Sequence, residues 1–73
     1  MNIGERLKAA RDAIGYTLEK AEKESSIGAS SLSEIENGRR DPKFSQLSKL
    51  AEIYKRSIDF FLTDNLPLHL ILL

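Results

Sequence analysis

Apolar side chains recur along most of this chain at steps of three and four residues, the spacing of one face of an α-helix. The first such face is made by Ile3, Leu7, Ala10 and Ile14. Gly15 follows directly, in the place where glycine commonly ends a helix. The pattern therefore predicts a first helix that begins near residue 3 and stops before Gly15.

Two short helices are expected next, separated by a turn over residues 26–28. Thr17 is a good N-terminal cap for the earlier of them, which runs from Leu18 to about Ser25. The later one runs from about Ala29 to Asn37 and buries Leu32 and Ile35. Asn37-Gly38 is a strong stop signal.

The remaining apolar positions predict two more helices and a tail. The fourth helix is expected to bury Phe44, Leu47, Leu50, Ala51 and Tyr54. Ser57 can cap a fifth, short helix that carries Ile58, Phe61 and Leu62. Outside the C-terminal tail, no segment alternates between apolar and polar residues with period two. The sequence thus predicts an all-α domain of five short helices over residues 1–64, followed by an apolar tail over residues 65–73.

Two charged residues border the predicted apolar faces. A helix advances about 100° per residue, which places Glu36 about 40° from Leu32 and Arg11 about 40° from Leu7. A partly buried carboxylate needs a partner, and an arginine fork can bond both of its oxygens. We predict a structural Arg11–Glu36 ion pair that ties the first helix to the third. The alternative is that both side chains reach water at the edge of the face.

Composition narrows the possible chemistry. The chain has 73 residues, enough for one small domain, and a core of this size makes oligomerisation a reasonable expectation. There is no cysteine and a single histidine, which argues against a disulfide framework and against cysteine-rich or histidine-rich metal sites. His69 has neither a second ligand nor a nucleophile beside it. We expect no catalytic residues, no metal, no cofactor and no enzymatic activity.

Charge and hydropathy also indicate where in the cell the protein is expected. Eleven basic and eleven acidic residues give a formal net charge of zero, so the whole chain exerts no general pull on nucleic acid or anionic lipid. The N-terminus lacks the long apolar stretch of a signal peptide, and the apolar tail is too short to span a bilayer. A cytoplasmic protein without membrane association is expected.

The segment from Thr17 to Gly38, TLEKAEKESSIGASSLSEIENG, resembles the helix-turn-helix of the Cro/phage-repressor family. The flanks IGERLKAARDAIGYT and RRDPKFSQLSKLAEIYKRSIDFFL extend the resemblance over residues 2 to about 63. Its most specific parts are the IENG at residues 35–38, the basic segment with proline after it, and the spacing of five helices. The resemblance implies a repressor-like domain that binds DNA, usually as a dimer, and it also implies the Arg11–Glu36 pair. The second helix would cross the DNA backbone and the third would enter the major groove.

The chain departs from the family pattern at three positions. Glu22 stands where the second helix usually carries a small residue, Ser26 where the turn usually has glycine, and Gly28 where a hydroxyl residue usually caps the third helix. Glycine adopts a positive φ more easily than serine does. We expect the fold to survive, with a looser or shifted contact between the second and third helices.

The family positions that face bases fall on Ala29, Ser30, Ser33 and Glu34. The helical wheel supports Ser30 and Glu34 most strongly. The third helix carries no Arg, Asn or Gln before Asn37, so the strong bidentate readers of guanine and adenine are absent from it. Glu34 can accept a hydrogen bond from cytosine N4, and otherwise it repels phosphate.

Phosphate contacts are expected mainly from the loop after the third helix. Residues 17–37 hold five acidic and two basic residues, a net charge of −3, whereas residues 38–56 hold six basic and two acidic residues, a net charge of +4. Backbone N–H groups at the start of the second helix can add an anion site. The alternative is that the arginines form an ordinary solvated loop. The residues expected at phosphate are Thr17, Asn37, Arg39, Arg40 and Lys43.

These observations predict a sequence-specific, DNA-binding transcriptional regulator, expected to be a repressor that acts as a homodimer on double-stranded DNA. One alternative is the DNA-binding module of a longer regulator. Another is an antitoxin-like module that uses the same fold to hold a protein partner. The tail LPLHLILL has three open interpretations: it packs back on the fourth and fifth helices, pairs with a second copy, or begins the next segment of a longer chain.

Overall fold

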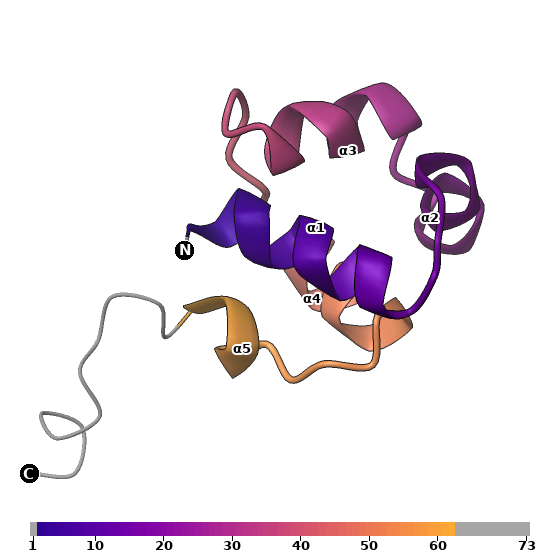
Figure 1. Ribbon diagram of the computed structural model, residues 1–73. Helices are drawn as coiled ribbons and strands as arrows, with labels where there is room; N and C mark the ends of the chain where they lie inside the picture. Colours follow the sequence, from indigo (N-terminus) through magenta and orange to yellow (C-terminus); the bar gives the residue numbers. More distant parts are fainter. Residues whose placement is uncertain (1, 63–73) are drawn as a thin grey trace, which may run out of the picture.

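The structure, a computed structural model, describes residues 2–62 and is all-helical over that range. Five helices follow one another along the chain (Figure 1): α1 (Ile3–Ala13), α2 (Leu18–Ser25), α3 (Ala29–Glu36), α4 (Phe44–Ile53) and α5 (Asp59–Leu62). The predicted all-α class is confirmed, and the bounds of α2 agree with the prediction at both ends. The predicted tail over residues 65–73 lies outside the described residues.

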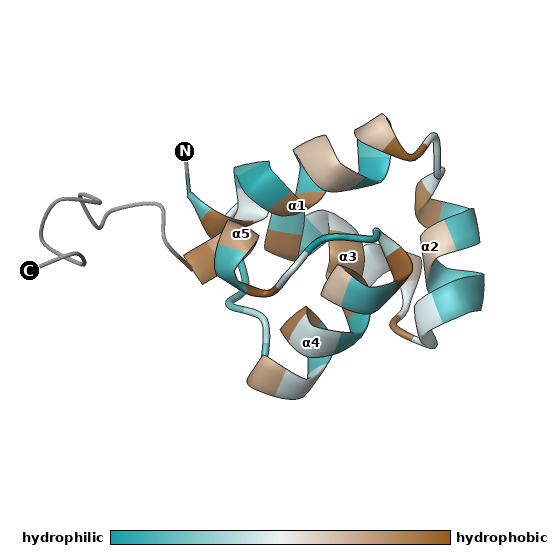
Figure 2. Cartoon of the chain, turned by 90° about the horizontal axis from the view of Figure 1, so that it is seen from below, coloured by the Kyte–Doolittle hydropathy of each residue, from teal (hydrophilic) through white to brown (hydrophobic). Residues whose placement is uncertain are grey.

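The helices are arranged around α1. α3 lies on one side of α1 and α5 on the other, while α2 sits at the end of the bundle and contacts both α3 and α4 (Figure 1). The outer side of α2 is hydrophilic (Figure 2). Consecutive short helices thus enclose a single core, and α2 and α3 are left with one side each toward solvent.

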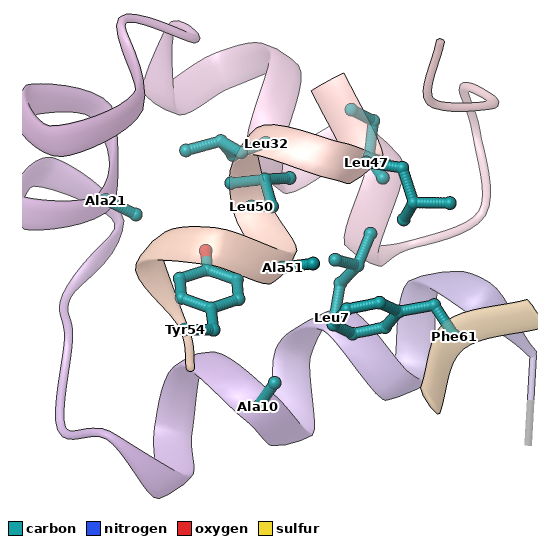
Figure 3. Packing of buried hydrophobic residues seen from close by; sticks show 10 residues of the cluster. Leu7, Ala10, Ala21, Leu32, Leu47, Leu50, Ala51, Tyr54 and Phe61 are labelled. Carbon is teal, nitrogen blue, oxygen red and sulfur yellow. The ribbon is translucent and has the colours of Figure 1, made fainter. Parts of the chain in front are cut away.

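The core takes side chains from all five helices (Figure 3). Its fully buried members include both large residues and alanines: Leu7, Ala10, Ala21, Leu32, Ile35, Leu47, Leu50, Ala51, Tyr54 and Phe61. The predicted burial of Phe44 was wrong, because its side chain is 68% exposed. Leu62 lies on α5, as predicted, and its side chain is 44% exposed. Phe44 is the first residue of α4 and Leu62 the last residue of α5. A wheel places a residue around the helix axis, and it does not show whether a neighbouring helix extends far enough to cover that residue.

Two glycines end helices as the sequence predicted. Gly15 after α1 and Gly38 after α3 have φ of +79° and +77°, in the left-handed region that favours glycine. At each end the chain turns back and satisfies carbonyls of the last helical turn, in the pattern of a Schellman motif. After α1, the N–H of Tyr16 donates to the carbonyl of Arg11 at 3.1 Å.

The Arg11 guanidinium joins three segments. Its Nε donates to Glu36 Oε2 at 2.8 Å and its Nη2 to Glu36 Oε1 at 3.0 Å, so the carboxylate is bonded at both oxygens. Its Nη1 donates to the carbonyl oxygen of Tyr16 at 2.8 Å. The two charged side chains are 11% and 7% exposed. The hydrogen bonds that Arg11 donates to Glu36 raise the pKa of Arg11, so the guanidinium stays charged while it links α1, α3 and the α1–α2 connection.

Gly4 allows α1 and α3 to touch through their backbones. A Cβ atom built at Gly4 would lie 2.8 Å from the carbonyl oxygen of Glu36 and still closer to that of Ile35. Real Cβ atoms do not approach backbone oxygens this closely, so a larger residue would push the helices apart. The sequence analysis missed this role. The available signal was a glycine inside a helix, where it costs roughly 0.5–1 kcal/mol relative to alanine and so suggests a packing reason.

Replacing either member of the Arg11–Glu36 pair should destabilise the fold. Arg11→Ala and Glu36→Ala each leave a buried charge without its partner, a loss of roughly 3–5 kcal/mol in the free energy of unfolding. Urea unfolding of both single variants and of the double variant measures the coupling. A double variant much milder than the sum of the singles is expected, and strictly additive losses would contradict the pairing.

Tyr54 carries a buried hydroxyl without a hydrogen-bond partner among residues 2–62. Its ring packs edge-on against Tyr16, with 6.3 Å between the ring centroids. Burial raises the pKa of Tyr54 to about 12, and the neighbouring Glu36 carboxylate acts in the same direction. Ionisation of this side chain is therefore harder in the folded protein than in the unfolded chain, where the pKa is 10.0.

This shift predicts alkaline destabilisation that depends on Tyr54. The folded pKa is raised, so the stabilisation is complete below the unfolded pKa of 10.0 and is lost as the pH rises toward about 12. Tyr54→Phe should remove this loss, and at pH 8 it should leave stability unchanged or slightly higher, because an unpaired buried hydroxyl is costly. Urea unfolding at about pH 8 and about pH 11 measures the loss of folding stability between these two pH values. Tyr16→Phe is the matched control, and an equal alkaline loss in Tyr54→Phe and wild type would contradict the assignment.

Candidate nucleic-acid interface

The turn between α2 and α3 is built from side-chain caps and one left-handed residue. Thr17 precedes α2, and its Oγ1 accepts the N–H of Lys20 at 3.0 Å. At the other end Ser26 adopts φ of 65°, and its N–H donates to the carbonyl of Glu22 at 2.8 Å. Ser25 Oγ then accepts the N–H of Ile27 at 3.1 Å. Ser26 thus takes the positive φ that the family pattern assigns to a glycine.

The buried side of α2 consists of small residues. Ala21 and Ser25 are buried, whereas Glu22 is exposed. The carboxylate that raised the expectation of a looser or shifted contact therefore stays out of the interface. α2 keeps a packed inner side and a solvated outer side, as a helix that crosses a DNA backbone requires.

The outer face of α3 is lined by small side chains. Ser30 is exposed, and Ala29, Ser33 and Glu34 are half-buried. Asn37, just after the helix, donates from Nδ2 to Ser33 Oγ at 3.4 Å. Ala29, Ser30 and Ser33, the small residues among the four predicted to face bases, have short side chains. None of these three can make a two-pronged hydrogen bond to one base.

Glu34 and Arg40 form an ion pair that the sequence analysis did not predict. Arg40 Nη2 lies 2.8 Å from Glu34 Oε1 and Arg40 Nε 2.9 Å from the same oxygen. The side chains are 54% and 45% exposed, so the pair lies at the surface. A residue predicted to face bases is thus held against one predicted to contact phosphate. The Asn37-Gly38 stop was the available signal, because a chain that reverses there returns toward the last turn of α3.

Two further basic residues of the predicted phosphate set lie in the connection between α3 and α4. Arg39 and Lys43 are exposed, and within residues 2–62 neither side chain makes a hydrogen bond or an ion pair. The backbone N–H of Lys43 donates to Gln46 Oε1 at 2.9 Å, where α4 begins. Both cations are therefore available to an anionic partner.

Pairing reduces the acidic excess of the helix-turn-helix. Glu36 is neutralised by Arg11, Glu34 lies against Arg40, and Glu24 lies 3.4 Å from Lys20 Nζ. In the described part of the chain, only Glu19 and Glu22 of the five acids in residues 17–37 have no such partner. The net charge of −3 counted along the sequence overstates the repulsion that a phosphate would meet.

A hollow of about 450 Å³ opens beside the interface, between the start of α1, the loop after α3 and α5. Its apolar lining includes Ile3, Phe61 and Leu62. Over residues 2–62 the chain has no group of three acidic or histidine side chains placed to hold a metal ion. No helix in that range is long and apolar enough to cross a membrane.

Comparison with known proteins decides the family. Residues 7–61 match the sequence model of a family described as helix-turn-helix, and these residues include every helix except the start of α1 and the last residue of α5. The chain belongs to the Cro/C1-type helix-turn-helix family. The predicted resemblance and fold class are confirmed.

The chain is also similar in sequence to a bacterial transcriptional regulator. Over 62 residues the chain is 42% identical to the HTH-type transcriptional regulator ImmR of Bacillus subtilis (strain 168). The matched part is 85% of this chain and 49% of the relative. The chain thus spans about half the length of the curated relative that it matches.

Proposed function

We propose that this chain binds double-stranded DNA as the recognition module of a transcriptional regulator and that it acts as a repressor. The observation that carries the proposal is the surface around α3. After an exposed face of small residues, the α3–α4 connection carries two cations without partners among the described residues, Arg39 and Lys43. The family and the regulator ImmR support the same function.

In this proposal α3 lies in the major groove and α2 crosses the adjacent backbone. Ser30 and Ser33, with Ala29 beside them, approach base edges. Phosphates are bound at both sides of the groove. On one side are Asn37, Arg39 and Lys43, and on the other are the first N–H groups of α2, next to Thr17.

Phosphate contact by Arg39 predicts a specific change in salt dependence. Arg39→Ala should weaken binding to all duplex sequences about equally, and it should reduce the slope of log affinity against log salt by roughly 0.9. Fluorescence anisotropy with a random duplex, titrated over a series of salt concentrations, measures both quantities.

Arg56→Ala is the matched control, because the α4–α5 connection that carries Arg56 lies on the far side of α1 from α3 (Figure 1). It should leave affinity and slope unchanged. A wild-type protein without salt-dependent binding would contradict DNA binding itself. A wild-type slope in Arg39→Ala would contradict only the contact.

We also propose that the regulator acts as a homodimer held through its C-terminal segment. Residues 66–73 contain one polar side chain, His69, among apolar ones. The last described residue before them, Leu62, is exposed and lines the hollow that Ile3 and Phe61 also line. A second copy that covers such residues would bury apolar surface that a small monomer rarely exposes.

Removal of residues 66–73 should therefore shift the protein toward monomer. Leu70→Lys should do the same, because it places a charge in an apolar contact. Sedimentation velocity of the two variants measures the mass. His69→Gln, which leaves every apolar residue in place, is the control and should sediment like wild type. An unchanged mass in both variants would exclude the tail as the dimer contact.

A further inference from the structure

The C-terminal end of α3 brings Arg40 back over the helix. Gly38, in the left-handed region, lets the N–H of Arg39 donate to the carbonyl of Glu34 at 2.8 Å. The N–H of Gly38 donates to the carbonyl of Ile35 at 3.1 Å, which completes the Schellman pattern. Arg40 is the next residue, so the backbone itself holds it close to Glu34.

The guanidinium of Arg40 uses only one of its edges in this contact. Nε donates to Glu34 Oε1, and Nη2 lies 2.8 Å from the same oxygen. Within residues 2–62 the outer edge, formed by Nη1 and Nη2, has no further partner. Two N–H donors that lie side by side on that edge match two acceptors on one base, and O6 and N7 of guanine form this pair in the major groove.

The rest of the surface leaves room for such a donor. Ala29, Ser30 and Ser33 are small, and each can make at most weak or single contacts with a base. A guanidinium that lies against α3 can therefore approach the groove beside them. No other residue on the outer face of α3 supplies a two-pronged donor.

We propose that Arg40, oriented by Glu34, reads a guanine in each DNA half-site. This inference rests on the proposed function, and it assigns a base-reading role to a loop residue that position alone would assign to phosphate. Glu34 is the positioning residue, since it fixes the guanidinium plane and touches no base.

Electrostatics favours this role over phosphate contact. If Arg40 left Glu34 for a phosphate, the carboxylate would remain unpaired beside the negatively charged backbone. If Arg40 and Glu34 stay together, the net charge of the pair is zero. The outer edge of Arg40, formed by Nη1 and Nη2, can still donate to acceptors on a base. Arg39 next to it, whose side chain has no partner within residues 2–62, already supplies the positive charge that phosphate attracts.

Selection of bound sites from a random duplex pool, followed by affinity measurements on single-base variants of the selected site, tests the proposal. The wild type should select a guanine in each half-site. Arg40→Ala should lower the preference for that guanine by about 10- to 100-fold and leave preferences elsewhere unchanged. Arg40→Lys should also lose much of it, because an ammonium is not a planar fork.

The Glu34 variants separate positioning from a merely structural role. Glu34→Ala should reduce the same guanine preference although Arg40 is present, with an unchanged thermal melt. Glu34→Gln keeps an oxygen that can accept from Arg40, so it should retain more of the preference. Arg39→Ala is the matched control, and it should lower affinity for every site without changing base preference.

Three results would overturn the assignment. One is a selected site without a guanine in each half. Another is an Arg40→Ala variant that keeps the guanine preference and instead loses affinity for all sites with a smaller salt slope, since Arg40 would then be a phosphate contact. The third is a Glu34→Ala variant that keeps the wild-type guanine preference. A wild type that binds no duplex DNA would overturn the proposed function and this inference with it.

Discussion

The buried ion pair between Arg11 and Glu36 sets the position of α3, and the candidate interface depends on that position. One guanidinium bonds both carboxylate oxygens and the Tyr16 carbonyl, so it holds α3, the end of α1 and the approach to α2 at once. The free-energy cost of removing two charges from water offsets much of the energy gained from their attraction. The pair is therefore better understood as a geometric constraint than as a source of net stability. Gly4 completes the constraint by letting the two helix backbones touch.

The same end of α3 carries a second arginine–glutamate pair on its outer side. Glu34 and Glu36 are two residues apart, so their side chains leave the helix about 200° apart. Glu36 points to the core and meets Arg11, while Glu34 points to solvent and meets Arg40. The inner pair fixes where the helix ends, and the turn at Gly38 then fixes where the loop begins. The outer pair depends on both, which makes the donor edge of Arg40 a consequence of the fold and not of loop composition alone.

Periodicity and stop signals could predict five helices, and the wheel positions of Arg11 and Glu36 could predict contact between them, because both are properties of single helices. The exposure of Phe44 depends on where neighbouring helices end, and a helical wheel does not contain that information. The role of Gly4 depends on the distance between two helix axes. The Glu34–Arg40 pair depends on the path of the chain after α3. Each failure thus concerns the placement of one element against another, and local patterns carry little information about that placement.

Charge counting shows the consequence for function. The formal net charge of the whole chain is zero, whereas the helix-turn-helix segment taken alone is acidic. In three dimensions two of its carboxylates are held by arginines from outside the segment, Arg11 and Arg40, and a third lies near Lys20. The cations without such partners in the described chain include Arg39 and Lys43, in the α3–α4 connection. Attraction to a phosphate backbone falls off within about 10 Å at 0.1 M salt, so these local charges matter more than the total. A neutral chain can therefore present a basic border to DNA, provided that its acids are paired on the side that faces the groove.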